Sequence, residues 1–253
     1  MLWYKAWLET RWRFFVGLFV LAFFSASGVF AQPLTDNLHV NIPNLGGRFD
    51  EMIREALSLM GSYPGYVWSQ WFGKNLLQFW TMFAVLLGVG GIANEAHRGT
   101  ALWTLSLPVT RRKLLGVRAG VGALELLALA VIPSLLIPAL SPLIGKTYSL
   151  GDTLAYSLMT FVGGMFFYGL TFLLSTVFAD QLKPIITGMS VAFIMGVLSL
   201  FSKSAAGYSV YNVMSGQKYF FEGVPPWMGL AACASAAAAM FALSLRVLER
   251  RDF

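Results

Sequence analysis

The side chains that most often carry catalysis or bind metals are few in this sequence and lie far apart. His39 and His97 are separated by an apolar run long enough to cross a membrane, so they cannot share a metal ion. Cys233 is the only cysteine, which excludes a CxxC pair and an internal disulfide. The letters "GKT" at 145–147 resemble the end of a phosphate-binding loop, but that motif requires glycine where the sequence has Leu140. We therefore expect no catalytic site, no metal site and no cofactor bound by this chain.

Glu125 is the one carboxylate well inside a long apolar run of the sequence. Ionisable side chains are costly in hydrocarbon, so this acid is a candidate intramembrane polar site with a functional role, such as carrying a proton. A plainer interpretation is that Glu125 lies nearer the inner surface, paired with Arg118 or with a polar side chain of another helix. No second intramembrane acid accompanies Glu125, which weighs against a proton relay.

The composition places these side chains in a membrane protein. Of 253 residues, 57% are apolar and 12% are charged, whereas a soluble domain has about 25% charged residues. A run of about 20 apolar residues crosses a bilayer as a helix, and barrel strands would alternate apolar with polar residues, which these runs do not. The sequence predicts an all-α integral membrane protein with six transmembrane helices, at 14–31, 71–93, 114–141, 153–178, 185–201 and 227–247.

The positions of lysine and arginine predict the orientation of these spans. With a cytoplasmic N-terminus, twelve of the 18 basic residues fall in inner segments and six in outer ones. Both termini and residues 94–113 are therefore predicted to be cytoplasmic, and residues 1–253 form a single domain that passes several times through the cell (inner) membrane. Because topology explains the net charge of +6, we expect contact with membrane lipids and no nucleic-acid partner.

The first 31 residues admit a second interpretation. The stretch "SASGVFAQ" offers Val29 and Ala31 at the spacing of a signal-peptidase site, and cleavage there would leave five spans. The leader is long, however, and residues 1–13 combine Trp and Leu with Lys and Arg, as a cytoplasmic amphipathic segment does. A retained first span is favoured, and cleavage stays open.

Two predicted external loops have patterns of their own. In the loop at 32–70, apolar residues at helical spacing predict an external amphipathic helix. We favour a helix that only packs as a lid on the spans, and contact with substrate is the alternative. The loop at 202–226 is rich in Tyr and Phe, which usually form an interfacial belt; a re-entrant segment lining an exit path is the alternative. The apolar residues of the first loop are Phe49, Met52, Ile53, Ala56, Leu57 and Met60.

The stretch "NEAHRGTALWTLSLPVTRRK", residues 94–113, separates the second and third predicted spans. Asn94 is a good N-cap, and Glu95 in the first turn suits the positive end of a helix dipole. Pro108 ends this helix and Thr110 can cap the next one. A membrane anchor at the lipid headgroups is formed by Arg111, Arg112 and Lys113. The pattern predicts a short cytoplasmic helix rigidly joined to two spans.

The same stretch resembles a segment of ABC-transporter permeases of the second type. In that family a Glu, a Gly-Thr pair, a Leu-rich turn, a Leu-Pro and a basic pair precede the third span. The ending "LRVLERRDF" resembles the basic C-terminal end of the family, and the topology extends the match over nearly the whole chain. A basic anchor alone does not explain this order of residues. The matching residues are Glu95, Gly99, Thr100, Leu105 to Leu107, Pro108, Arg111 and Arg112.

The resemblance implies the permease subunit of an ATP-driven transporter, usually an exporter, in which the insert contains a coupling helix that docks on a separate ATPase. ATP and Mg would then bind two copies of that partner, and a second permease subunit would complete a homodimer or a heterodimer. The loop at 32–70 is longer than in compact members, so the resemblance implies no substrate. The implied ATPase-coupling residues are Glu95, Arg98, Gly99, Thr100, Leu102, Leu105 and Pro108.

Two other classes of protein stay open. A proton-driven secondary transporter would use Glu125 as its carrier, although the sequence has no convincing internal repeat of the kind such transporters contain. A membrane scaffold or regulator would transport nothing and would stimulate no ATP turnover with any partner.

Overall fold

The computed structural model describes residues 2–36, 59–89, 110–178, 180–201 and 209–249, and these residues form helices and no strand. The prediction of an all-α protein is confirmed. The helices are α1 (Leu2–Asp36), α3 (Tyr63–Val67), the π-helix η1 (Trp68–Asn75), α4 (Leu76–Gly88), α7 (Arg111–Leu140), the 3-10 helix η2 (Ser141–Ile144), α8 (Leu150–Val177), α9 (Leu182–Phe201), α11 (Val210–Met214), α12 (Gln217–Glu222) and α13 (Trp227–Glu249).

Four helical stretches of the described residues are long and apolar enough to cross a membrane. They are Leu2–Pro33, Arg111–Ile144, Leu150–Val177 and Trp227–Glu249, and a shorter apolar helix covers Leu182–Leu198. These stretches fit a membrane protein; they contain the first, third and sixth predicted spans and all of the fourth except its last residue, Phe178.

The second predicted span, 71–93, differs from the helices in its position. Helical structure begins at Tyr63, because Ser62 caps α3 through its side chain and Pro64 occupies the first turn. It continues through η1 and α4 and ends at Gly88, after which Val89 is extended. The helical stretch therefore starts eight residues earlier than predicted, because capping chemistry rather than hydropathy sets its N-terminal end.

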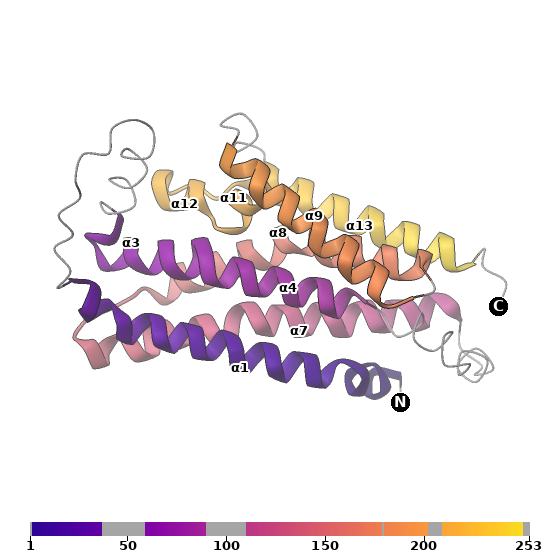
Figure 1. The fold of residues 1–253 in the computed structure, drawn as a ribbon, viewed down its shortest axis with the longest axis horizontal. Helices are drawn as coiled ribbons and strands as arrows, with labels where there is room; N and C mark the ends of the chain where they lie inside the picture. Colours follow the sequence, from indigo (N-terminus) through magenta and orange to yellow (C-terminus); the bar gives the residue numbers. More distant parts are fainter. Residues whose placement is uncertain (1, 37–58, 90–109, 179, 202–208, 250–253) are drawn as a thin grey trace.

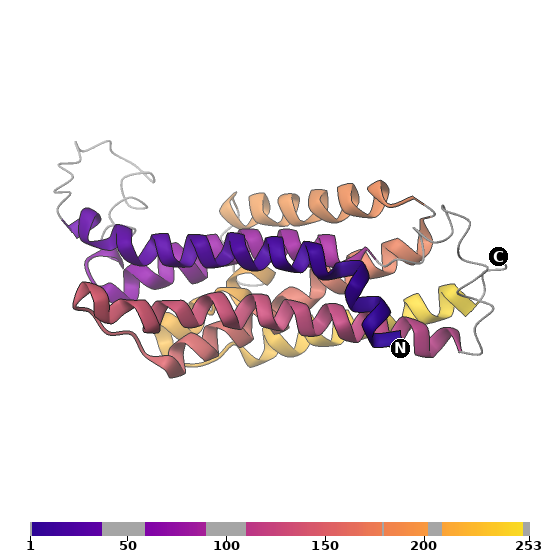
Figure 2. The same ribbon diagram turned by 90° about the horizontal axis from the view of Figure 1, so that it is seen from below.

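The long helices lie side by side along the long axis of the molecule (Figure 1). Both termini lie at the same end of this bundle, where α4 ends and α7 begins, while α12 and η2 lie toward the other end (Figures 1 and 2). The end of α4 and the start of α7, which flank residues 90–109 in the sequence, therefore lie at the end of the bundle where the chain starts and finishes.

The core is centred on α8, which packs against α4, α7, α9, α11 and α13. Its largest fully buried side chains include Trp80, Tyr168, Phe72 and Phe167. The Trp80 ring packs directly over Gly164, and its indole N–H donates to the Leu126 carbonyl at 2.9 Å. An indole in an apolar core needs such a partner. The hydrogen bond joins α4 to α7, and the packing of the ring on Gly164 joins α4 to α8.

Residues 1–13 were predicted as an amphipathic segment, and from Leu2 onward they are the first turns of α1. Figure 2 shows α1 changing direction near its N-terminal end, where it lies against α7. Ala6 is buried there with Val117 and Val121, and Leu2 and Trp7 pack against this small cluster. The segment therefore packs against a neighbouring helix.

Candidate functional site

The residues predicted to couple to an ATPase lie outside the described residues. Glu95, Arg98, Gly99, Thr100, Leu102, Leu105 and Pro108 all fall within 90–109. Most of the external helix predicted from Phe49 to Met60 also lies outside, since the described chain resumes at residue 59. The described part of the candidate site is therefore the set of side chains that flank residues 90–109.

The start of α7 has the predicted N-cap. Thr110 has extended backbone angles, φ −64° and ψ 142°, and its side chain accepts a hydrogen bond from the Lys113 backbone N–H at 3.3 Å. The prediction that Thr110 caps this helix is confirmed. The cap fixes the direction in which the chain enters α7.

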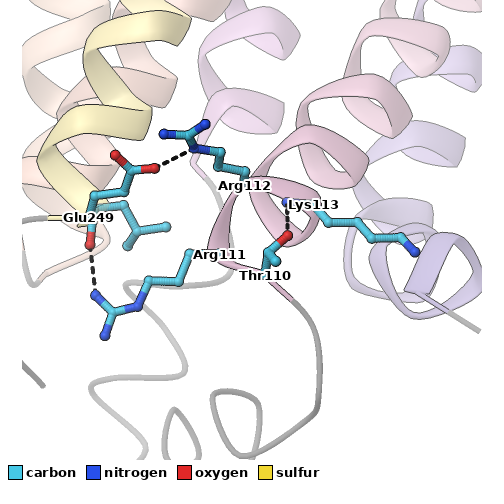
Figure 3. Close-up of polar contacts among 6 residues, drawn as sticks. Thr110, Arg111, Arg112, Lys113 and Glu249 are labelled. Carbon is cyan, nitrogen blue, oxygen red and sulfur yellow. Dashed lines mark hydrogen bonds and ion pairs between the residues drawn. The ribbon is translucent and has the colours of Figure 1, made fainter.

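Arg111 and Arg112, predicted as membrane anchors, also contact the end of α13 (Figure 3). Arg111 Nη1 donates to the carbonyl of Leu248 at 2.9 Å, and Arg112 Nε donates to Glu249 Oε1 at 2.5 Å. Lys113 points away from α13 in the same view. Since a helix C-terminus carries partial negative charge, Arg111 is placed where a cation stabilises α13 most.

The end of α4, which precedes residues 90–109, also accepts a hydrogen bond from an arginine. Arg13 of α1 donates from Nη1 to the Leu86 carbonyl, in the last turn of α4, at 2.7 Å. Arg13 of α1 thus binds the end of α4, and Arg111 and Arg112 tie the start of α7 to the end of α13. The sequence patterns pointed to basic residues near a membrane surface and did not identify these carbonyl partners.

Polar side chains also join the first turns of α1 to the N-terminal half of α7. Glu9 forms an ion pair with Arg118, with 3.2 Å between Oε2 and Nη2, and Thr10 Oγ1 lies 2.6 Å from Glu125 Oε1. Glu125 is 5% exposed. Of the two partners weighed for Glu125, the structure selects a polar side chain of another helix, and Arg118 is bound by Glu9.

At the opposite end of the bundle, α11 and α12 form a short helical hairpin against α8. Met214 is fully buried, and its carbonyl accepts a hydrogen bond from Thr160 at 3.0 Å. Because Thr160 lies about 15 Å along α8 from Leu150, at 1.5 Å per residue, the hairpin reaches well into the bundle. Gly216, with φ 62°, makes the turn between its helices, and the side chains of α12 are not buried.

Aromatic contacts fasten this hairpin to the rest of the bundle. Trp68 of the π-helix η1 stacks on Phe220, with ring centroids 4.5 Å apart, and donates its indole N–H to the Ser215 carbonyl at 2.9 Å. Tyr219 donates to Asp152 Oδ1 at 3.1 Å, and this bond to a carboxylate raises the pKa of Tyr219, so its hydroxyl stays a donor at neutral pH. A π-helix often marks a functional position in a helix, and no sequence pattern indicated this one.

Removal of the Arg111 side chain is expected to loosen the last turn of α13. A cation at a helix C-terminus contributes about 1 kcal/mol, which corresponds to about a fivefold change in an equilibrium constant. In Arg111→Ala, hydrogen exchange in the last turn of α13 should be about fivefold faster than in the parent protein, measured by mass spectrometry. Lys113→Ala is the matched control, and equal exchange in the two variants would contradict the expectation.

Among the described residues, no group of three or more His, Cys, Asp and Glu side chains could hold a metal ion. Comparison of the chain with protein-family models, with curated proteins and with solved structures found no match.

Proposed function

We propose that this chain is the transmembrane permease subunit of an ATP-driven transporter of the ABC type 2 permease class, acting as an exporter. The observation that carries the proposal is the order of Glu95, Gly99, Thr100 and Pro108, immediately before the capped, basic start of α7. The proposal is supported by the bundle of long apolar helices and by the end of α4 and the start of α7, which lie at the end of the bundle that holds both termini.

In this proposal the chain crosses the cell (inner) membrane six times. The six spans are α1, the continuous helical stretch of α3, η1 and α4, then α7, α8, α9 and α13. Both termini and residues 94–113 face the cytoplasm, as the distribution of basic residues predicts. The hairpin of α11 and α12 is then a re-entrant segment on the external side, which its depth beside α8 supports. Backbone of this kind is tolerated at membrane depth where protein buries it.

The partners in this proposal are those that the family resemblance implies. Residues 1–253 contain no phosphate-binding loop. ATP and Mg would bind an ABC ATPase subunit, present in two copies, and a second permease subunit, identical or related, would complete the transporter. Substrate would move through a cavity between the two permease subunits.

The mechanism assigns a mechanical role to residues 94–108. Closure of the ATPases on ATP displaces this coupling segment, and α4 and α7 transmit the displacement. The hydrogen bonds of Arg13 to the end of α4, and of Arg111 to the end of α13, extend it to both terminal helices. ATP can drive the change only if it binds the two conformations with different affinity.

Variation of the coupling segment tests the proposal. Glu95→Lys combined with Gly99→Trp should abolish ATPase co-purification from the native membrane and ATP turnover coupled to transport. Glu222→Lys, a charge reversal at an exposed site on α12, is the matched control and should leave both unchanged. Unchanged ATPase binding and turnover in the double variant would refute the proposal, as would isolation of the parent chain as a lone monomer.

A further inference from the structure

Glu125 is buried with only part of its hydrogen-bonding capacity used. It lies about 21 Å along α7 from Arg111, at 1.5 Å per residue, and is 5% exposed. Thr10 lies 2.6 Å from Oε1, whereas Oε2 is buried without a hydrogen-bond partner in the described part of the chain. A buried charge is costly unless it is paired and hydrogen-bonded, so the bare Oε2 atom favours the neutral acid.

The Thr10 hydroxyl can serve Glu125 in either protonation state. It has one proton but lies near three acceptors: Glu125 Oε1 at 2.6 Å, the Ala6 carbonyl at 3.2 Å and the Trp7 carbonyl at 3.4 Å. When Glu125 is ionised, the hydroxyl donates to Oε1. When Glu125 is protonated, the acid donates to Thr10 Oγ1 and the hydroxyl turns to Ala6. The bond between the two helices therefore survives the gain or loss of a proton.

Two ionisable side chains from neighbouring helices lie near Glu125, and only Arg13 acts on its charge. Arg13 of α1 favours the carboxylate electrostatically while it donates to the Leu86 carbonyl. Tyr168 of α8 is also in range, but its hydroxyl donates to the Ala119 carbonyl at 3.1 Å. Burial and one nearby cation thus act in opposite directions on the charge of Glu125.

The remaining charged groups near this part of α7 are engaged elsewhere. Arg118, two turns earlier on the same helix, is bound by Glu9 of α1. Between Leu76 and Gly88, α4 contains no ionisable side chain. On α13, Glu249 meets the start of α7, where Arg112 binds it.

We propose that Glu125 is a proton-binding site whose occupancy sets how tightly the first turns of α1 hold to α7. Docking of α1 buries the carboxyl group and favours its neutral form, whereas separation of the two helices gives it access to water and favours the carboxylate. Docking and proton uptake are therefore linked, so the contact is strong at low pH and weakens as the pH rises. This proposal does not depend on the proposed ATPase partner.

Infrared spectroscopy of the full chain in phosphatidylcholine vesicles tests for the proton directly. At neutral pH we expect a carbonyl band of a protonated carboxylic acid that disappears in Glu125→Gln and remains in Glu222→Gln, whose carboxyl group is exposed. In Thr10→Val the band should persist at a shifted frequency, because the acid loses its acceptor. Absence of a band that depends on Glu125 at every pH where the chain stays folded would overturn the proposal.

Spin labels at two exposed sites, Tyr4 on α1 and Leu182 on α9, test the linkage to α1. Cys233 is replaced by alanine so that the labels react only at the introduced cysteines. As the pH rises, a population with a changed distance should appear in the chain that keeps Glu125, and Glu125→Gln should show none. A pH response of equal size in Glu125→Gln would overturn the linkage.

Discussion

Valine in place of Gly164 is expected to destabilise the bundle more than any other single change considered for this chain. A Cβ atom at Gly164 would overlap the Trp80 ring, which is fully buried, and the ring cannot move without breaking its hydrogen bond to Leu126. Overpacking a core costs about 1–3 kcal/mol, and an indole N–H left buried without its partner costs about 1–3 kcal/mol more. The variant should unfold at a much lower temperature in detergent, followed by near-ultraviolet circular dichroism.

Two further variants show whether the overlap is the cause. Gly116, on α7, has open space at the position of a Cβ atom, so Gly116→Val should stay close to the parent stability. Trp80→Leu combined with Gly164→Val should be more stable than Gly164→Val alone, because the smaller side chain leaves room for the valine. If Gly164→Val unfolds like Gly116→Val, Trp80 is not held against α8 as described.

Alanine in place of Glu9 is expected to be the most damaging change at the polar contact between α1 and α7. The Arg118 side chain is 6% exposed, and the variant removes its ion-pair partner. Breaking a fully buried pair costs about 3–5 kcal/mol. Because the Glu9 side chain is 30% exposed, solvent screens part of this pair, and we expect a loss of about 2 kcal/mol. Thermal unfolding in detergent measures the loss.

An exposed pair provides the control for Glu9. Lys218 and Glu222 of α12 are 52% and 61% exposed, so Glu222→Ala should change stability by less than about 0.5 kcal/mol. Leucine at both Glu9 and Arg118 should recover much of the stability, since replacing both members of a buried pair by apolar residues is often neutral. Equal losses in Glu9→Ala and Glu222→Ala would mean that Arg118 does not depend on Glu9.

Local sequence features predicted the class of fold and several helix ends. Long apolar runs predicted the helices because a membrane helix satisfies its own backbone and its length follows from bilayer thickness. The cap at Thr110 was predictable because a capping side chain bonds a backbone group only three residues away. Hydropathy alone did not place the start of the second span, since the capping residues at Ser62 and Pro64 lie outside its apolar run.

The pairing of charged side chains was decided only when distant helices came together. The sequence left open whether Arg118 or a polar side chain of another helix meets Glu125. Packing of α1 on α7 paired Arg118 with Glu9, more than one hundred positions away, and placed Thr10 at Glu125. Likewise, the sequence showed Arg111 to Lys113 as one basic cluster. The tertiary structure distinguishes its members, because Arg111 and Arg112 bind the end of α13 and Lys113 points away from it.

By itself, then, the sequence determined the helical class, the N-cap at Thr110 and the order of residues on which the transport proposal rests, because each depends on neighbours along the chain. The tertiary structure decided which helix ends the arginines cap, which side chain reaches Glu125 and where a π-helix forms. Those choices depend on the relative position of helices far apart in sequence, a quantity that no local pattern contains.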